Sequence, residues 1–106
     1  MLTVYTSPLC PDCRECKVNF DAHKIEYTAI DITESMKNLK AFLKLRDSSP
    51  VFDPCRERGF VGIPAIVRAD GGVTLDWECV LTERGLPVVY REEKPPLACS
   101  LDGKGC

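Results

Sequence analysis

The sequence has no large excess of positive or negative charge and no long apolar run, and it contains a single histidine. Its 14 Lys and Arg residues against 16 Asp and Glu residues give a net charge of -2, so its composition provides no general attraction to nucleic acid or to an anionic membrane. Nowhere does it hold the roughly 18 consecutive apolar residues of a membrane-spanning helix, and it opens without the basic and apolar regions of a secretion signal. We therefore expect a cytoplasmic protein that binds neither nucleic acid nor membrane.

Cysteine, in contrast, is abundant, with seven residues in a chain of 106. The odd number argues against a secreted disulfide scaffold, which more often carries an even number. A hydrophobic composition of 44% is enough for one domain to bury its own core without structural crosslinks. In a reducing compartment, clustered cysteines indicate redox chemistry or a metal site.

The first third of the chain predicts a strand, a helix and a second strand. Residues 2–6 (LTVYT) are largely β-branched or aromatic, and the turn SPLCP leads into a helix from Pro11 to about Ala22. Residues 25–32 (IEYTAIDI) predict a buried strand. Because a helix connects the two strands, they should be parallel.

A second helix is predicted from Thr33 or Ser35 to about Arg46, with apolar side chains spaced three and four residues apart. The side chains expected to point inward are Met36, Leu39 and Leu43. Three lysines should lie together on the other side, as a solvated face or as a docking surface for an acidic partner. These are Lys37, Lys40 and Lys44.

The remaining segments predict a loop, a hairpin and a closing helix. Residues 47–60 hold two prolines and a glycine and predict a loop with room for one helical turn over residues 55–58. Residues 63–77 have two β-rich runs about a DGG turn, which is typical of an antiparallel hairpin, and residues 78–85 predict a short helix. The expected fold class is therefore α/β, with a four-stranded mixed sheet flanked by about three helices.

We place this domain at residues 1–91 and expect residues 92–106, which are polar and interrupted by prolines, to form a flexible tail. The tail carries Cys99 and Cys106. These two cysteines have four possible roles. They could form a second dithiol that exchanges electrons with Cys10, or bind a metal. They could also form a disulfide that alters partner binding on oxidation, or have no special role.

Two motifs carry a resemblance to a known family. They are YTSPLCPDC (residues 5–13), which ends the first strand, and VGIPA (residues 61–65), which opens the hairpin. Over roughly residues 1–86 the chain resembles the glutaredoxin branch of the thioredoxin-like proteins. The resemblance implies a thiol–disulfide oxidoreductase without a bound cofactor, acting on protein disulfides or glutathione mixed disulfides. It also implies that Cys10 is the nucleophile, Cys13 the resolving thiol and Pro64 a cis proline.

The chain differs from the common glutaredoxin pattern at three points. Asp12 replaces a tyrosine, Ser7 stands where a basic residue is often found, and the two glycines of the DGG turn lie within the hairpin instead of after the last strand. The expected partners are disulfide-containing proteins and an electron donor, for which glutathione and a flavin reductase both stay open. We expect a monomer.

The position of each thiol on the predicted helix gives a physical reason for its role. A thiolate, and not a thiol, attacks a disulfide. Cys10 falls at the N-cap with Pro11 at the first helical position, so free backbone N–H groups and the helix dipole favour negative charge on its sulfur. Cys13 lies one turn further in and should keep its proton until needed. Asp12 either repels the thiolate or points to solvent and stabilises the first helical turn.

Pro64 and Ile63 are candidate substrate contacts, together with Pro11 and Asp12. A cis bond is accessible mainly to X-Pro pairs. At the start of a strand it would leave the backbone N–H and C=O of Ile63 free to pair with an extended substrate. The alternative is an ordinary trans proline at the start of a strand.

The other cysteines have competing interpretations. Cys16 falls on the apolar stripe of the first helix, which favours core packing, because free cysteine is among the most buried residue types. The alternative is a metal or iron-sulfur carrier that uses Cys10, Cys13 and Cys16. Structural zinc sites and iron-sulfur clusters usually have four protein ligands. The fourth ligand would be Cys55, Cys79, a tail cysteine or a partner's residue.

Three other side chains are candidates for capping or binding roles. His23, near the end of the first helix, is expected to cap backbone carbonyls and not to bind a metal. Arg56 and Arg58 either hold a substrate carboxylate or are solvated.

Overall fold

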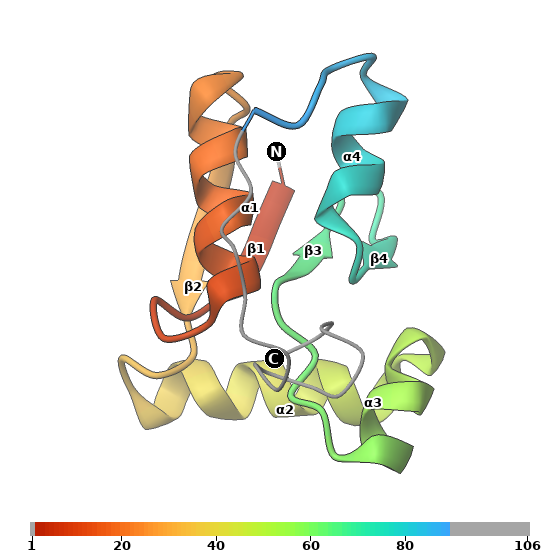
Figure 1. Cartoon of the computed structure of the whole chain (residues 1–106). Helices are drawn as coiled ribbons and strands as arrows, with labels where there is room; N and C mark the ends of the chain where they lie inside the picture. The colour runs from red at the N-terminus through yellow and green to blue at the C-terminus, as the bar shows by residue number, and fades with distance from the viewer. Residues whose placement is uncertain (1, 90–106) are drawn as a thin grey trace.

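The computed structural model describes residues 2–89 of the chain. Within these residues the chain forms one four-stranded sheet, four α-helices and a short 3-10 helix (Figure 1). In chain order the elements are β1 (Leu2–Thr6), α1 (Pro11–Ala22), β2 (Tyr27–Asp31), α2 (Met36–Ser48), the 3-10 helix η1 (Pro50–Phe52), α3 (Asp53–Arg58), β3 (Ala65–Val67), β4 (Val73–Thr74) and α4 (Trp77–Glu83).

The sheet has the strand order β2-β1-β3-β4. β1 pairs parallel with β2 and antiparallel with β3, and β3 pairs antiparallel with β4. The predicted mixed sheet, the parallel first pair and the antiparallel hairpin are therefore confirmed. This arrangement is that of a thioredoxin-like fold. β1 and β3 are the two inner strands, and the chain leaves the end of β1 directly into the cysteine motif.

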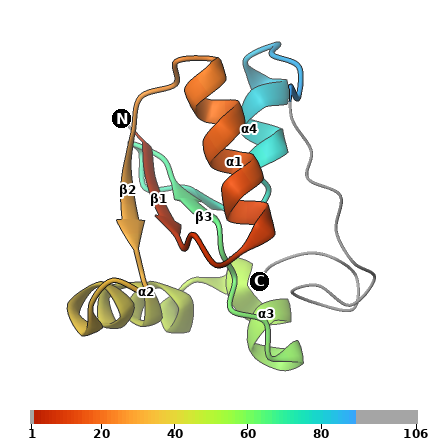
Figure 2. The same cartoon turned by 60° about the vertical axis from the view of Figure 1, so that its left-hand side comes forward.

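The two faces of the sheet take part in two hydrophobic clusters. α1 and α4 cover one face (Figure 2), where Val4 of β1 packs with Phe20 of α1 and Leu81 of α4. Tyr5, the next residue of β1, points the other way and packs against Phe42 of α2, with ring centroids 5.7 Å apart. Successive side chains of a strand face opposite sides, so β1 contributes to both clusters. The second cluster, which contains Cys10 and Cys13, is called the active-site cluster below. Its buried members are Cys10, Cys13, Ile32, Phe42, Phe52, Cys55, Ile63 and Ala65.

Local signals explain where the helices begin and end. α1 begins at Pro11, whose missing N–H is not needed at the first helical position. The side chain of Ser35 caps α2 by accepting a hydrogen bond from the Asn38 N–H at 3.1 Å, and Asp76 caps α4 in the same way. α3 ends at Gly59, which has a φ of 77° and so adopts the left-handed conformation that glycine tolerates best.

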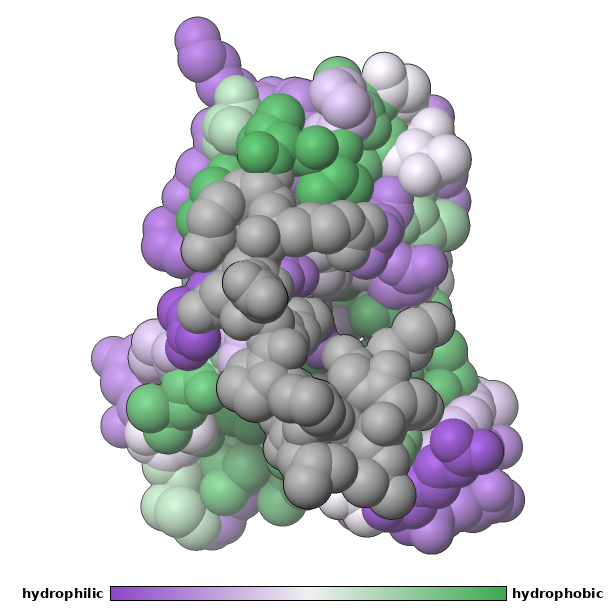
Figure 3. Space-filling view, in the orientation of Figure 1, coloured by the Kyte–Doolittle hydropathy of each residue, from purple (hydrophilic) through white to green (hydrophobic). Residues whose placement is uncertain are grey.

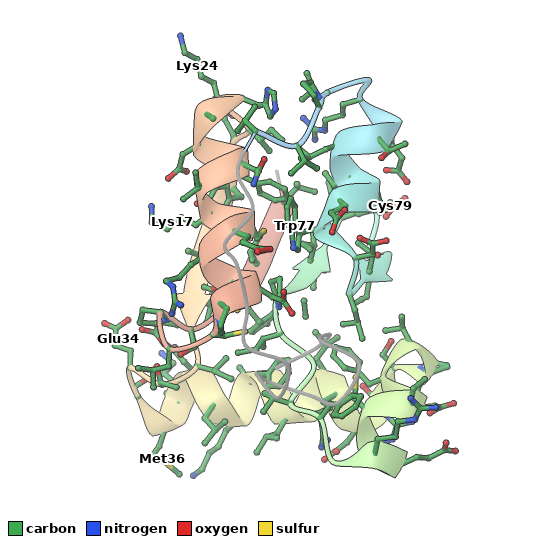
Figure 4. The ribbon with its side chains drawn as sticks, in the orientation of Figure 1. Lys17, Lys24, Glu34, Met36, Trp77 and Cys79 are labelled. Atoms are coloured by element: carbon green, nitrogen blue, oxygen red, sulfur yellow. The ribbon has the colours of Figure 1, made fainter. Side chains whose placement is uncertain are left out.

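The predicted inward face of the second helix is wrong in part. Met36 is 65% exposed and Leu43 is 39% exposed, whereas Phe42, which lies outside the predicted inward face, is fully buried. In Figure 4, Met36 points away from the sheet. The reason is aromatic packing, because Phe42 fits between Tyr5 and Phe52, with its ring centroid 5.8 Å from that of Phe52. The helix is therefore rotated so that Leu39 is only partly buried. The three lysines are exposed.

Two other expectations need correction. The segment at residues 47–60 holds more helix than predicted, because α2 extends to Ser48 and η1 follows it. The helical turn predicted over residues 55–58 is part of α3, and the α-helices number four instead of about three. The second strand is shorter than residues 25–32 and lies at the sheet edge, with Thr28 and Ala29 exposed. No helix in the described part of the chain is both long enough and apolar enough to span a membrane.

Candidate active site

The fold brings the two sequence motifs together. Cys10 lies between β1 and α1, and Cys13 lies in the first turn of α1. Tyr5 pairs in register with Ala65 of β3, and this pairing places the Ile63-Pro64 segment beside the end of β1. Cys10, Cys13 and Ile63 are all buried in the active-site cluster. The Ile63-Pro64 peptide bond is cis, as predicted from the motif.

The two cysteines of the motif differ in their electrostatic surroundings. A hydrogen bond to Cys10 raises the pKa of the Cys13 thiol well above its ordinary value, and burial and the negative charge of Cys10 raise it further. Contacts with Thr6 and the Ser7 backbone oppose this shift without cancelling it. Cys13 therefore keeps its proton at neutral pH and donates it toward the Cys10 sulfur. Cys10 occupies the N-cap of α1, where the helix dipole favours a thiolate.

The loop before Cys10 is held by polar contacts that the sequence motif did not reveal. The Ser7 hydroxyl lies 3.2 Å from that of Thr33 and accepts a hydrogen bond of 3.2 Å from the Leu9 N–H. The Cys10 N–H donates to the Ser7 carbonyl, also at 3.2 Å. Ser7 thus fixes the turn that presents Cys10. The SPLCP turn signal pointed to this residue, but its partner, 26 positions along the chain, has no local signal.

Asp12 does not point freely into solvent. It is 8% exposed, in the first turn of α1, so the interpretation of Asp12 as a solvent-facing side chain is wrong. Pro11 beside it is partly buried. A carboxylate in the first turn favours the start of the helix. Its position two residues after Cys10 makes it a candidate for tuning the Cys10 thiol.

Cys16 is separated from the other two thiols of the motif. Its side chain packs in the cluster between α1 and α4, with Phe20 and Trp77, and not in the active-site cluster. Burial, followed by the negative charge of Asp21, raises the pKa of Cys16 to about 12. The structure therefore places Cys16 in the core, as the apolar stripe predicted. Within residues 2–89 no group of three or more His, Cys, Asp or Glu side chains is placed to hold a metal ion.

The other two described cysteines lie in different places. Cys55 is buried in the active-site cluster. Cys79 lies on the side of α4 away from α1 (Figure 4), and its Sγ donates to Glu83 Oε2 at 3.5 Å. This hydrogen bond is the main reason that the pKa of Cys79 is raised. Cys99, Cys106 and the predicted boundary at residue 91 lie outside the described residues.

The side chains of His23 and Arg56 contact backbone carbonyls. The backbone N–H of His23 caps the end of α1 by donating to the Asn19 carbonyl at 3.1 Å, and its side-chain Nε2 lies 2.6 Å from the Pro87 carbonyl oxygen, in the segment after α4. Arg56 forms an ion pair with Asp53 and donates to the carbonyls of Arg46 and Ser49. The guanidinium of Arg56 therefore ties α3 to the end of α2, and Arg56 is exposed, which fits the solvated alternative better than the substrate-binding one. Arg58 is exposed.

The fold and the paired thiols beside a cis proline define a thioredoxin-like protein with a dithiol site. Comparison with known proteins identifies the branch. The glutaredoxin family model matches residues 2–68, and the chain therefore belongs to the glutaredoxin family. It is also 37% identical over 73 residues to an uncharacterized protein of Haemophilus influenzae, an alignment that covers 69% of this chain and 85% of the relative. Membership in this family supports a role of the thiol–disulfide oxidoreductase type.

Proposed function

We propose that this protein reduces disulfides through Cys10 and Cys13, with Cys10 as the attacking thiol and Cys13 as the resolving thiol. The observation that carries the proposal is the hydrogen bond between the two cysteines, which raises the pKa of Cys13. A dithiol needs one sulfur that is ready to attack and one that stays protonated until the mixed disulfide exists. The N-cap position of Cys10 and the raised pKa of Cys13 support this division.

The proposed reaction has two exchange steps. The Cys10 thiolate attacks one sulfur of the substrate disulfide, forming a Cys10–substrate disulfide and releasing the other sulfur as a thiolate that takes up a proton. Cys13 then loses its proton and attacks the Cys10 sulfur, which releases the second substrate thiol and leaves a Cys10–Cys13 disulfide. Two electrons have moved from the protein to the substrate. Two glutathione molecules or a flavin reductase would return them, and no bound cofactor is required.

We assign substrate contacts to the residues around the two thiols. The backbone of Ile63, immediately before Pro64, would pair with an extended disulfide-containing peptide. Pro11 and Asp12, the first two residues of α1, would contact the substrate next to Cys10. The partners are therefore disulfide-containing proteins and a reductant. The monomeric state and the cytoplasmic location stay predictions.

The test compares the wild type with Cys13→Ser and Cys10→Ser on two substrates, a glutathione mixed disulfide and a protein disulfide. We expect Cys10→Ser to abolish turnover of both, because the attacking sulfur is removed. Cys13→Ser should lose turnover of the protein disulfide, since nothing then resolves the Cys10–substrate bond. If Cys13→Ser keeps its activity on the glutathione mixed disulfide, glutathione itself resolves the intermediate. Wild-type activity that survives in Cys10→Ser would refute the proposal.

A further inference from the structure

A pocket of about 250 Å³ lies between α2 and the segment at residues 59–61. Its walls are almost entirely apolar and include Leu39 and Leu43 of α2 and Phe60 and Val61 of the segment. Leu43 is partly exposed and Val61 is 44% exposed, so the pocket opens to the surface. In Figure 3, apolar side chains gather over α2 in the lower part of the molecule. Such a surface provides burial for a bulky apolar side chain.

Arg46 is the one charged residue that lines this pocket. Its Nη2 donates to the Phe60 carbonyl at 2.7 Å and to the Cys55 carbonyl at 3.4 Å, so the guanidinium is fixed in place. Its Nε is buried and has no hydrogen-bond partner among the described residues. No carboxylate within residues 2–89 pairs with Arg46. A fixed and uncompensated positive charge in an apolar pocket is complementary to a carboxylate beside an apolar group.

The pocket adjoins the proposed substrate site. Phe60 packs against the active-site cluster, which contains Cys10 and Ile63. Val61 precedes Ile63 by two residues, a distance of roughly 7 Å in an extended chain. A substrate strand that pairs with the Ile63 backbone would therefore pass the mouth of the pocket about two to three residues from its cysteine.

We propose that this pocket selects disulfide substrates in which a bulky apolar side chain stands next to a carboxylate, within about three residues of the attacked cysteine. The apolar side chain packs between Leu43 and Val61, and the carboxylate binds Arg46. This inference rests on the proposed oxidoreductase function, because it places the pocket beside the substrate path. It adds a specificity determinant to that function.

The experiment uses the full chain and short peptides that carry a thionitrobenzoate group on their single cysteine. Cys10 attacks the peptide sulfur, the peptide–thionitrobenzoate bond breaks, and the acidic thionitrobenzoate thiolate leaves and is measured by its colour. The peptides carry Leu-Glu, Leu-Gln or Ser-Glu two and three residues after the cysteine in one series, and before it in another. We expect kcat/KM for Leu-Glu to exceed that for Leu-Gln by about fivefold in one series, the upper range for a partly exposed ion pair. The preference should shrink with added salt.

Variants locate the preference. Arg46→Gln should abolish the preference for Leu-Glu over Leu-Gln, whereas Lys44→Gln, which removes the same charge from an exposed position on the same helix, should keep it. Because Arg46→Gln also removes two hydrogen bonds, a second variant, Val61→Glu, places a negative charge at the pocket without touching them. It should reverse the preference. Ratios between two peptides on one variant are unaffected by a change in the amount of folded enzyme.

A binding measurement separates this inference from the proposed function. In an NMR titration of the reduced protein with a Leu-Glu peptide that has serine in place of cysteine, the amide signals of Leu43 and Val61 should shift, and Arg46→Gln should need about fivefold more peptide for the same shifts. Wild-type protein that reduces all peptides at equal rates and shows no such shifts would overturn the pocket assignment and leave the proposed function standing. Equal rates and absent shifts are also expected if another segment of this chain or a second copy fills the pocket, and this occupant too would overturn the assignment to substrate. Peptide binding without reduction would support the pocket and refute the proposed function.

Discussion

Gly62 gives the sharpest structural prediction, because a side chain there meets two obstacles at once. Its φ is 96°, a backbone conformation that residues with a Cβ rarely adopt. A Cβ added at Gly62 would lie 2.9 Å from Cδ1 and 3.0 Å from Cε1 of Phe52, and 3.4 Å from the Cys55 sulfur. Phe52 is fully buried and packs edge-on against Phe42, so its ring has no free space into which to move.

The expected loss of stability is the sum of a backbone cost and a packing cost. The left-handed backbone costs an L-residue about 1–2 kcal/mol, and overpacking of a close-packed site costs about 1–3 kcal/mol more. We therefore expect Gly62→Ala to lower the free energy of unfolding by about 2–5 kcal/mol. Gly71 provides the matched control, since its φ is 92° and an added Cβ would meet nothing within 4 Å. Gly71→Ala should cost only the backbone term, about 1–2 kcal/mol.

The assay is urea unfolding followed by the fluorescence of Trp77, the single and buried tryptophan of the chain. The difference between the two variants isolates the contact with Phe52. If Gly62→Ala is no less stable than Gly71→Ala, the close packing of the Ile63-Pro64 segment against η1 is refuted. A double variant with Phe52→Leu should show coupling, because the two residues share one contact.

Two further predictions concern the cysteines outside the active pair. Because burial raises the pKa of Cys16 to about 12 from its ordinary value of 9.0, the unfolded chain releases this proton first as pH rises above about 9, and the free energy of unfolding should fall between about pH 9 and 12. Unfolding curves at several pH values should show a shallower fall in Cys16→Ala, and equal slopes would contradict the assigned burial. Glu83→Gln should lower the pKa of Cys79, since Glu83 is the main cause of its raised value. Faster alkylation of Cys79 at pH 8 than in wild type checks this, with Glu78→Gln as the control from the same helix.

Local signals were sufficient for the elements that carry the dithiol. The β-branched strand at residues 2–6, Pro11 at the start of a helix and the Ile63-Pro64 motif each involve neighbours in sequence, and the structure agrees with all three. Helix α3 was predicted only as one turn over residues 55–58, although its full length also had local signals, because a proline suits a helix start and Gly59 suits a helix end. The two prolines of residues 47–60 favoured a loop in the prediction, whereas in the structure each lies in the first turn of a helix, Pro50 in η1 and Pro54 in α3.

Other features depend on contacts that no local pattern contains. Periodicity allowed α2 to be rotated either toward Leu43 or toward Phe42, and the aromatic contacts with Tyr5 and Phe52 decided it. Ser7 finds its partner in Thr33, and Arg56 binds carbonyls of α2 and of the residue that follows it. Sequence alone supplies the chemical type of such side chains, whereas the partner is fixed only when separate elements pack.

The sequence gives the position of Asp12 beside Cys10, and the structure gives its burial. Together they lead to a prediction about the attacking thiol. It lies in the first turn of α1, two positions after Cys10, and it is buried instead of solvated. A negative charge held close to a sulfur in poorly hydrated surroundings opposes formation of the thiolate. We therefore expect Asp12→Tyr, which restores the common glutaredoxin residue, and Asp12→Asn to increase the fraction of Cys10 present as thiolate at neutral pH. The measurement is the thiolate absorbance of each variant against pH, with Cys10→Ser subtracted. Asp21→Asn removes an equal charge from the exposed far end of the same helix and should leave the titration unchanged. An unchanged Cys10 titration in both Asp12 variants would show that this carboxylate only stabilises the start of the helix.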